Sequence, residues 1–154
     1  MSNEELKQFI LNIVPKAEFT ESHQMLYVSI PKENMKKLVK GLKDTAETSF
    51  DYLYNITGVD WADHMTVVYH LESTKYHHCV VLKAQISDRE DPVIETISDL
   101  YLGANFHERE VYDFFGITFK NHPDMRRIFL DEIAPDIGHP LRKDYKDDIN
   151  IIER

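Results

Sequence analysis

Three consecutive stretches with the pattern of β-strands constrain the fold more than any other feature of this chain. They cover residues 50–56, 65–71 and 80–86, and they are rich in aromatic or β-branched residues or alternate with a two-residue period. The connection between the second and third stretches, near residues 73–77, is short enough for a β-hairpin. Strands joined in this way pair antiparallel. The middle of the chain therefore predicts a mainly antiparallel sheet.

Helical patterns lie on either side of these strands. Ser2 and Glu5 have the spacing of a capping box, and apolar residues then recur at helical intervals until Pro15. Four further elements are predicted, in chain order: a strand at residues 26–30, helices at 35–42 and 93–101, and a short helix at 103–115 that ends at Gly116. Strands grouped beside separate helices favour an α+β fold, with the helices packed on one face of the sheet.

From Thr118 onward the sequence has no sustained period of either kind. Charged residues are dense there, and prolines interrupt it at positions 123, 135 and 140. The segment nevertheless contains more large apolar side chains than a solvated linker would carry: Phe119, Ile128, Phe129, Leu130, Leu141 and Tyr145. We therefore predict an α+β domain at residues 1–117 and an extended partner-docking tail at residues 118–154. By itself such a tail is either disordered or ordered by its partner, and its apolar side chains account for the second alternative.

Composition and charge exclude several classes of function. The formal net charge of −9 argues against nucleic-acid binding, which needs a basic surface. The longest apolar runs are only a few residues, so no direct membrane span is expected. The acidic, polar start MSNEELKQ does not resemble a secretory signal and favours a cytoplasmic location. Cys79 is the only cysteine, so the chain by itself cannot form a disulfide, a cysteine zinc site or an iron–sulfur cluster.

Motifs for cofactor chemistry are missing from the sequence. The five glycines are scattered and form neither G-x-G-x-x-G nor G-K-[ST], so NADH or flavin binding through a glycine-rich turn is not expected. His107 and Glu108 begin like the zinc motif H-E-x-x-H, but Val111 stands where the second histidine ligand would be. We expect no metal site on this chain.

The densest charge pattern is the segment from Glu108 to Asp113. In a helix, Arg109 and Asp113 lie one turn apart and can form an ion pair. The carboxylates of this segment could serve acid–base catalysis. Alternatively, the helix is held by ion pairs while Phe114 and Phe115 fill the core, and the spacing favours this second interpretation.

Two further segments, residues 122–127 and 138–145, each join a His-Pro dipeptide to a pair of basic residues. Proline restricts its own φ angle and the conformation of the preceding residue, so both segments present their basic side chains from a stiff bend. Guanidinium groups suit bidentate contacts with carboxylates. Contact with a partner and bracing within the chain both fit this pattern.

Together, EREVYDFFGITFKNHPDMRRIF (residues 108–129) and GHPLRKDY (residues 138–145) closely resemble the signature of the C subunit of NADH:quinone oxidoreductase, respiratory complex I. ITGVDW (residues 56–61) also looks like this family. One departure is that Phe106-His107 stands where the family usually has Trp followed by a bulky residue. Phe106 can fill the same pocket with less area.

The resemblance implies a subunit of the peripheral arm that carries no cofactor and clasps the D-type subunit with its tail. That neighbour, with the B-type cluster subunit, forms the quinone site, and FMN, iron–sulfur clusters and quinone belong to partner subunits. The complex is a proton-translocating oxidoreductase, and this subunit lies peripherally on the cytoplasmic side of the inner (plasma) membrane. The resemblance carries no catalytic residue. The motif positions are expected to be structural and interface residues: Glu108, Arg109, Glu110, Asp113, Gly116, His122, Pro123, Asp124, Arg126, Arg127, His139, Pro140, Arg142, Lys143 and Asp144.

Other hypotheses remain open at this point. The same domain occurs in relatives of complex I, including membrane-bound hydrogenases, F420H2 dehydrogenases and the photosynthetic NDH complex. From different classes, the chain could be an independent small enzyme that uses Glu108, Glu110 and Asp113, or a peptide-binding module whose tail folds on its partner.

Overall fold

The fold is built on one five-stranded mixed sheet. The computed structural model describes residues 2–21, 25–130 and 137–146. The strand order is β1-β2-β5-β4-β3, with β2 and β5 parallel and all other neighbours antiparallel. The strands are β1 (Glu18–Glu21), β2 (Leu26–Pro31), β3 (Tyr52–Asp60), β4 (Met65–Ser73) and β5 (His78–Ile86).

The predicted central strands and their hairpin are confirmed. β4 and β5 pair in register from Met65 with Ile86 to Ser73 with His78, so only residues 74–77 form the connection. The predicted strand at residues 26–30 is β2. β1 was not predicted, because its four residues, EFTE, are too few and too polar to show a period.

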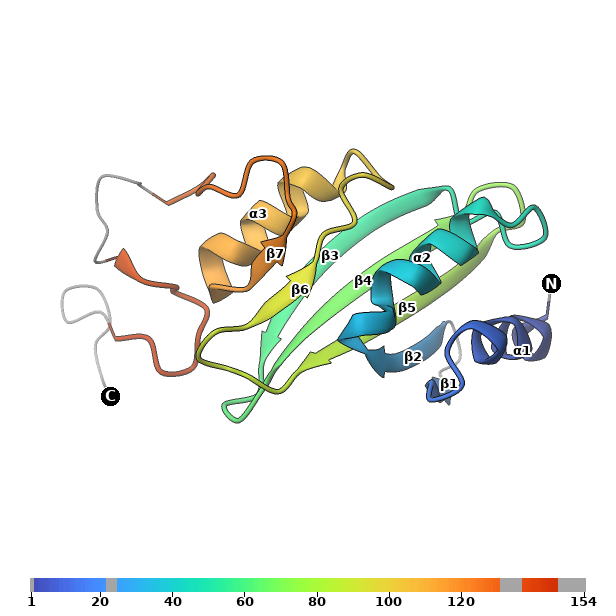
Figure 1. Cartoon of the computed structure of the whole chain (residues 1–154), viewed down its shortest axis with the longest axis horizontal. Coiled ribbons are helices and arrows are strands. Elements are labelled where there is room, and N and C mark those ends of the chain that lie inside the picture. The colour runs from blue at the N-terminus through green and yellow to red at the C-terminus, as the bar shows by residue number, and fades with distance from the viewer. Residues whose placement is uncertain (1, 22–24, 131–136, 147–154) are drawn as a thin grey trace.

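Three helices accompany the sheet: α1 (Asn3–Ile13), α2 (Met35–Asp44) and α3 (Ala104–Phe115). Figure 1 shows α2 and α3 on the same face of the sheet, as expected for the predicted α+β fold. A 3-10 turn, η1 (Lys32–Asn34), leads into α2. The predicted capping box begins α1, where the Glu5 N–H donates to Ser2 Oγ and the Ser2 N–H donates to Glu5 Oε2.

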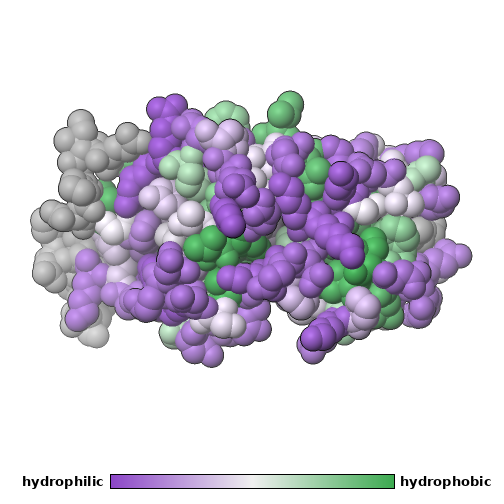
Figure 2. Space-filling view, in the orientation of Figure 1, coloured by the Kyte–Doolittle hydropathy of each residue, from purple (hydrophilic) through white to green (hydrophobic). Residues whose placement is uncertain are grey.

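The core lies between the helices and the sheet. Its members include Leu38 and Leu42 of α2, Val111 of α3, and alternate residues of the strands, such as Val67 and Leu82. On the outer surface of this helical face, hydrophilic side chains dominate and apolar ones gather in separate patches (Figure 2).

The predicted helix at residues 93–101 is wrong. Residues Val93–Glu95 instead form strand β6, which pairs in parallel with β7 (Thr118–Lys120), and this small sheet lies between α2 and α3 in Figure 1. Ile94 and Ile97 are buried as a helical stripe would be, so the apolar spacing was misleading. Thr96 and Ser98 hydrogen-bond to each other, and hydroxyl side chains that bond locally compete with a helix.

β7 also shows that the beginning of the segment predicted to be a tail takes part in the fold. Phe119 is buried in the core, and the Thr96 N–H donates to the Lys120 carbonyl at 3.0 Å. The boundary after residue 117 remains a prediction. Of the rest of the tail, residues 131–136 and 147–154 lie outside the described residues.

A glycine in β3 allows α3 to approach the sheet closely. A Cβ atom at Gly58 would lie 2.7 Å from Cδ2 of Phe115, closer than real contacts allow. Phe115 packs against the core, as predicted, whereas the Phe114 ring stacks on the ring of Phe129 in the tail. α3 is therefore attached to β3 through one aromatic residue and to the tail through its neighbour.

Candidate functional site

Most of the predicted motif residues gather on α3 and on two tail segments, residues 122–130 and 137–146. Two of the three carboxylates on α3, Glu108 and Asp113, have an exposed fraction of 0%. The helix ends at Gly116, as predicted, in a left-handed conformation with φ of 73°. The two tail segments return to this helix and are fixed there by hydrogen bonds of the motif residues.

Asp113 holds the first tail segment by its backbone. Its Oδ2 atom accepts the N–H groups of residues 128–130 at 2.8, 2.7 and 3.2 Å. Its Oδ1 atom accepts a hydrogen bond from Arg127 Nη1 at 3.1 Å. Burial alone would raise the pKa of Asp113, but these four donors together lower it below its ordinary value. The side chain is therefore a buried anion that organises the segment.

The predicted ion pair between Arg109 and Asp113 is wrong. Arg109 donates from Nε and Nη2 to the backbone carbonyls of Arg126 and Arg127, both at 3.0 Å. Asp113 takes Arg127 as its cation instead. Helical spacing indicated that the pair was within reach, but the tail supplies both a competing cation for the carboxylate and carbonyl acceptors for Arg109.

The second tail segment covers the end of α3. His139 Nδ1 donates to the Asp113 carbonyl at 2.9 Å, and beyond Pro140 the Leu141 N–H donates to the Phe114 carbonyl at 3.0 Å. A Cβ atom at Gly116 would lie 2.7 Å from Cδ2 of His139. Glycine is therefore required at position 116 both for its positive φ and for the room it leaves to His139.

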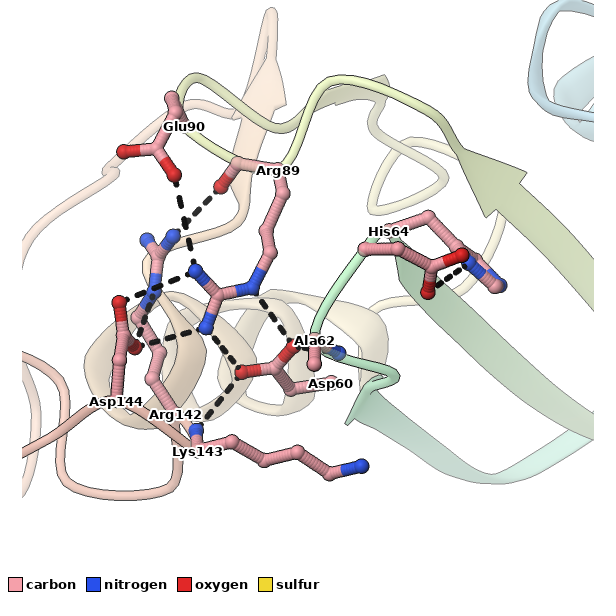
Figure 3. A network of polar contacts seen from close by, with 9 residues as sticks. Asp60, Ala62, His64, Arg89, Glu90, Arg142, Lys143 and Asp144 are labelled. Atoms are coloured by element: carbon pink, nitrogen blue, oxygen red, sulfur yellow. Dashed lines mark hydrogen bonds and ion pairs between the residues drawn. The ribbon is translucent and has the colours of Figure 1, made fainter.

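A separate ion-pair network anchors the Arg142–Asp144 part of the tail to the far end of β3. Figure 3 shows Arg89 between two carboxylates, with Nε and Nη2 donating to Asp60 at 2.9 and 2.7 Å and Nη1 and Nη2 donating to Asp144 at 3.1 and 2.8 Å. The Lys143 N–H donates to Asp60 at 2.8 Å, and Arg142 donates to the Arg89 carbonyl at 2.6 Å. The hydrogen bonds from Arg89 hold the pKa of Asp60 well below its ordinary value and also lower that of Asp144.

Asp60 and Arg89 were missed as site residues. Asp60 lies in ITGVDW, whose likeness to the family was a usable signal, but nothing in the sequence linked it to residues 143 and 144. Arg89 lies in the break after β5, where a lone arginine among acidic residues is not distinctive. Only the return of the tail to the sheet brings these residues together.

Glu108 faces the interior of the domain. Its Oε1 atom accepts the Ile97 N–H at 2.8 Å, and Oε2 accepts the Thr96 hydroxyl. Burial outweighs these two donors and raises the pKa of Glu108 from its ordinary value of 4.5 to about 7.

His122 lies beside Glu108 with a fully buried side chain. Its Nδ1 atom accepts the Asp124 N–H at 3.0 Å, so the proton of the neutral ring is on Nε2, which donates to the Asn105 carbonyl at 3.2 Å. The same Nε2 lies 3.8 Å from Glu108 Oε2. Burial lowers the pKa of His122, which favours the neutral ring.

The remaining motif residues lie at or near the surface. Arg126 has a side chain that is 64% exposed and pairs with Asp124 at 3.0 Å. Pro123 and Lys143 are exposed, and Glu110 is partly exposed. Phe106, expected to fill a pocket, is 62% exposed and points outward from α3.

The acid–base hypothesis names three carboxylates, and of these Glu110 is partly exposed. Glu108 and Asp113 are closed off from solvent, and their oxygens already accept hydrogen bonds from the protein. In the described parts of the chain, no group of three or more His, Cys, Asp or Glu side chains is arranged to hold a metal ion. The helices found among these residues are also too short or too polar to cross a membrane.

The fold and the clasped tail define an α+β domain whose charged motif fixes its own C-terminal segment. Residues 28–149 match the family described as "Respiratory-chain NADH dehydrogenase, 30 Kd subunit". The chain belongs to this family, whose members include the C subunits of NADH-quinone oxidoreductases.

Individual relatives agree with this assignment. The C subunit of the NADH-quinone oxidoreductase from Roseiflexus castenholzii is 39% identical over 122 residues, which cover 77% of this chain and 68% of the relative. The C/D subunit of the same oxidoreductase from Phocaeicola vulgatus is 41% identical over 124 residues, which cover 80% of this chain and 23% of the relative. The chain thus spans less than a quarter of the length of the C/D relatives.

A solved structure shares the fold. A chain of the membrane-bound sulfane sulfur reductase, described as an archaeal respiratory membrane complex, superposes with a TM-score of 0.78 and is 30% identical. The match covers 93% of this chain and 85% of that one. The domain therefore also occurs in a respiratory complex other than an NADH dehydrogenase.

Proposed function

We propose that this chain is a cofactor-free subunit of the peripheral arm of a proton-translocating NADH:quinone oxidoreductase, where it docks on and supports the D-type, quinone-site subunit. Membership of the 30 kDa subunit family supports the complex. The relatives named C/D support the neighbour, because their name joins the C and D subunits in one chain. A covalent link keeps two parts at high effective concentration, which serves parts that act in contact.

One observation of the site carries the supporting role. Hydrogen bonds of the motif residues Asp113 and Arg109, and of Arg89, fix the chain's own tail. This network holds the tail in a defined position against the domain, and a surface fixed in this way suits binding to another subunit.

The rest of the assignment follows from the proposed complex. FMN, iron–sulfur clusters and quinone are assigned to partner subunits. For the clusters this assignment is supported by the single cysteine of this chain, which cannot hold a cluster alone. The B-type cluster subunit is the second expected neighbour. The chain lies on the cytoplasmic side of the membrane as a peripheral component.

Purification from native membranes tests this function. The full chain, tagged in its own genome and extracted in mild detergent, should bring down the D-type and B-type subunits together with flavin and iron–sulfur absorbance and NADH:quinone activity. A solitary chain, or one with an activity of its own, would refute the proposal. The electron-input subunit that co-purifies distinguishes NADH dehydrogenase from hydrogenase, F420H2 dehydrogenase, photosynthetic NDH or sulfur-reducing relatives.

A further inference from the structure

We propose that His122 is a pH-sensitive latch, which holds the turn after β7, residues 121–124, against α3 while its ring is neutral and releases that turn when the ring is protonated. Glu108 is the second member of the latch, because it decides whether a counter-ion is present when the ring takes up a proton. The latch is a property of this chain alone and does not depend on the proposed function.

Both ring nitrogens of His122 make hydrogen bonds that only a neutral ring allows. Nδ1 faces the Asp124 N–H at 3.0 Å, and Nε2 faces the Asn105 carbonyl at 3.2 Å. A backbone N–H can only donate and a carbonyl can only accept, so Nδ1 has no proton and Nε2 has one. A second proton on the ring would have to go to Nδ1, where it would meet the N–H of Asp124.

Protonation of His122 therefore replaces a hydrogen bond by two donors that face each other. The Asp124 N–H loses its acceptor, and the ring gains an N–H that points at another N–H. The side chain of His122 is fully buried, so water does not reach these groups to take over the hydrogen bonds. The turn must open before the ring can be charged and solvated at the same time.

Glu108 could serve as the counter-ion of a charged ring, since its Oε2 atom lies 3.8 Å from Nε2 of His122. Acidification removes that possibility. The pKa of Glu108 is raised to about 7, above the ordinary 6.5 of histidine, so the carboxyl group gains its proton before the ring does. A ring that is protonated at lower pH therefore has a neutral acid beside it, which does not offset the burial of its charge.

Other charged groups near His122 do not favour a charged ring inside the protein. Burial is the main cause that lowers the pKa of His122, and the positive charge of Arg109 on α3 acts in the same direction. The negative charge of Asp124 acts against them, but this carboxylate is also paired with Arg126 at 3.0 Å. The pKa of the ring remains lowered.

The charges on the Glu108 side of the pair come from three other elements. Lys36 of α2 lowers the pKa of Glu108 and Asp99 raises it, and Lys36 is itself paired with Asp99 at 3.0 Å and with Glu95 of β6 at 3.6 Å. Tyr69 of β4 is fully buried, and burial raises its pKa, so its hydroxyl stays neutral. These groups leave the pKa of Glu108 raised by burial.

The other attachments of the first tail segment do not need a neutral base. Asp113, whose pKa is lowered, stays charged at mildly acidic pH and holds the N–H groups of residues 128–130. Arg109 holds the carbonyls of residues 126 and 127. Mild acidification should therefore open the turn at residues 121–124 and leave residues 128–130 in place.

Amide hydrogen exchange of the full chain at pH 7.5 and pH 5 tests the latch. Rates are expressed as protection factors, so that the intrinsic dependence of exchange on pH cancels. Below 6.5, the ordinary pKa of histidine, each pH unit should favour opening of the turn by up to about tenfold until the lowered pKa of the folded ring is reached. Protection of the Asp124 N–H should fall accordingly, whereas residues 128–130 should keep theirs.

Two results of this measurement would overturn the latch. One is equal protection of the Asp124 N–H at both pH values. The other is an equal loss of protection at Asp124 and at residues 128–130, because it would show that acid loosens the whole segment.

His122→Asn is the matched variant. An asparagine side chain can accept the N–H of the second residue after it, so it keeps an acceptor for the Asp124 N–H and takes up no proton. The fall in protection between pH 7.5 and pH 5 should disappear in this variant, whatever its overall stability. His77→Gln, at an exposed histidine between β4 and β5, is the control and should leave the fall unchanged. A fall that persists in His122→Asn would assign the effect to another group.

Proton–nitrogen correlation NMR of the His122 ring observes its protonation directly. At pH 7.5 the ring should carry a proton on Nε2 and none on Nδ1, and the proton on Nδ1 should appear together with the loss of protection at Asp124. Protons on both nitrogens at pH 7.5 would show that Glu108 and His122 form an ion pair, and the latch would be wrong.

Discussion

Glu108 and Asp113 offer a controlled comparison between two buried positions on one helix. Both carboxylates lie on α3 and both have an exposed fraction of 0%, yet the pKa of Glu108 is raised to about 7 and that of Asp113 is lowered. Burial disfavours the charged form at both positions. The difference is the set of donors: Glu108 has one N–H and one hydroxyl, whereas Asp113 has three N–H groups and a guanidinium.

The comparison shows that attachment of the tail depends on a charge. The donors to Glu108 come from residues 96 and 97 inside the domain. These two hydrogen bonds do not require the Glu108 carboxyl group to be charged. The donors to Asp113 all come from residues 127–130 of the tail, and they need the carboxylate as a common acceptor. Neutralising Asp113 should therefore destabilise the fold, whereas neutralising Glu108 should make the fold more stable relative to the wild type as the pH rises.

The largest effect is expected at Asp113. Asp113→Asn removes one partner of a buried, hydrogen-bonded ion pair and should lower the free energy of unfolding by about 3–5 kcal/mol. Urea unfolding at pH 8 measures the loss, and Glu110→Gln, on a partly exposed position of the same helix, should change stability by less than about 0.5 kcal/mol. Equal stabilities for the two variants would show that the charge of Asp113 is dispensable.

Glu108 should show the opposite sign through its dependence on pH. Its folded pKa of about 7 exceeds the ordinary 4.5, so the folded state holds an extra proton between these values. The contribution of Glu108 is present below pH 4.5 and is lost as the pH rises through 7, by about 3 kcal/mol. Asp113, with a lowered pKa, contributes above pH 3.8 and stays constant in this window.

Comparison with Glu108→Gln isolates that contribution. His122, whose pKa is lowered by burial, is present in both proteins. The difference between their unfolding free energies at pH 5 and pH 8 therefore reports Glu108 together with its contact with His122. The unfolding free energy of Glu108→Gln, relative to that of the wild type, should increase as the pH rises. A constant difference between the two proteins would mean that Glu108 does not change its protonation in the folded state.

A smaller effect is expected where the tail closes over the end of α3. Gly116→Ala introduces a side chain at a φ of 73° and pushes against His139, which should cost about 1–3 kcal/mol. In the double variant Gly116→Ala, His139→Ala, the clash is relieved and only the backbone strain remains. A double-mutant cycle by urea unfolding should therefore show coupling, and additive losses would place His139 away from Gly116.

The smallest effect is expected at Asp144, whose side chain is 62% exposed. Asp144→Asn should lower global stability by less than about 1 kcal/mol, because exposed ion pairs are screened by water and salt. Hydrogen exchange should nevertheless quicken in residues 141–146, and the wild type should approach the variant as salt is added. If hydrogen exchange in residues 141–146 is unchanged at low salt, the hydrogen bonds of Arg142 and Lys143 are sufficient to hold this segment.

Periodicity identified the elements whose own residues carry the pattern. Strands β2, β4 and β5 and helices α1 and α2 were predicted because their apolar residues repeat on one face. Strand β3 was predicted from its aromatic residues, and α3 from the glycine that ends it. β1, β6 and β7 are three or four residues long and form only because another strand is in reach. The error at residues 93–101 has the same cause, because β6 forms by pairing with β7, and the local sequence around residue 93 gives no sign of that pairing.

The interface role of the motif residues stays a prediction, and the sequence did not identify their partners within the chain. Arg109 and Asp113 are neighbours on one helix, and yet each bonds to the tail. Asp60 and Arg89 could not be selected, because their importance depends on where residues 143 and 144 return. Spacing along a helix limits which groups can meet, but it does not decide among competitors that arrive from elsewhere in the chain.

The sequence by itself determined the α+β class, the family and the absence of a glycine-rich phosphate loop, because these depend on residues close together in the chain. Only the tertiary structure decided which charges are buried, which donors surround them and which way each pKa moves. Those properties are set by solvent exclusion and by contacts between distant segments. For this reason Glu108 and Asp113, about one turn and a half apart on α3, have pKa values shifted in opposite directions and bind different parts of the chain.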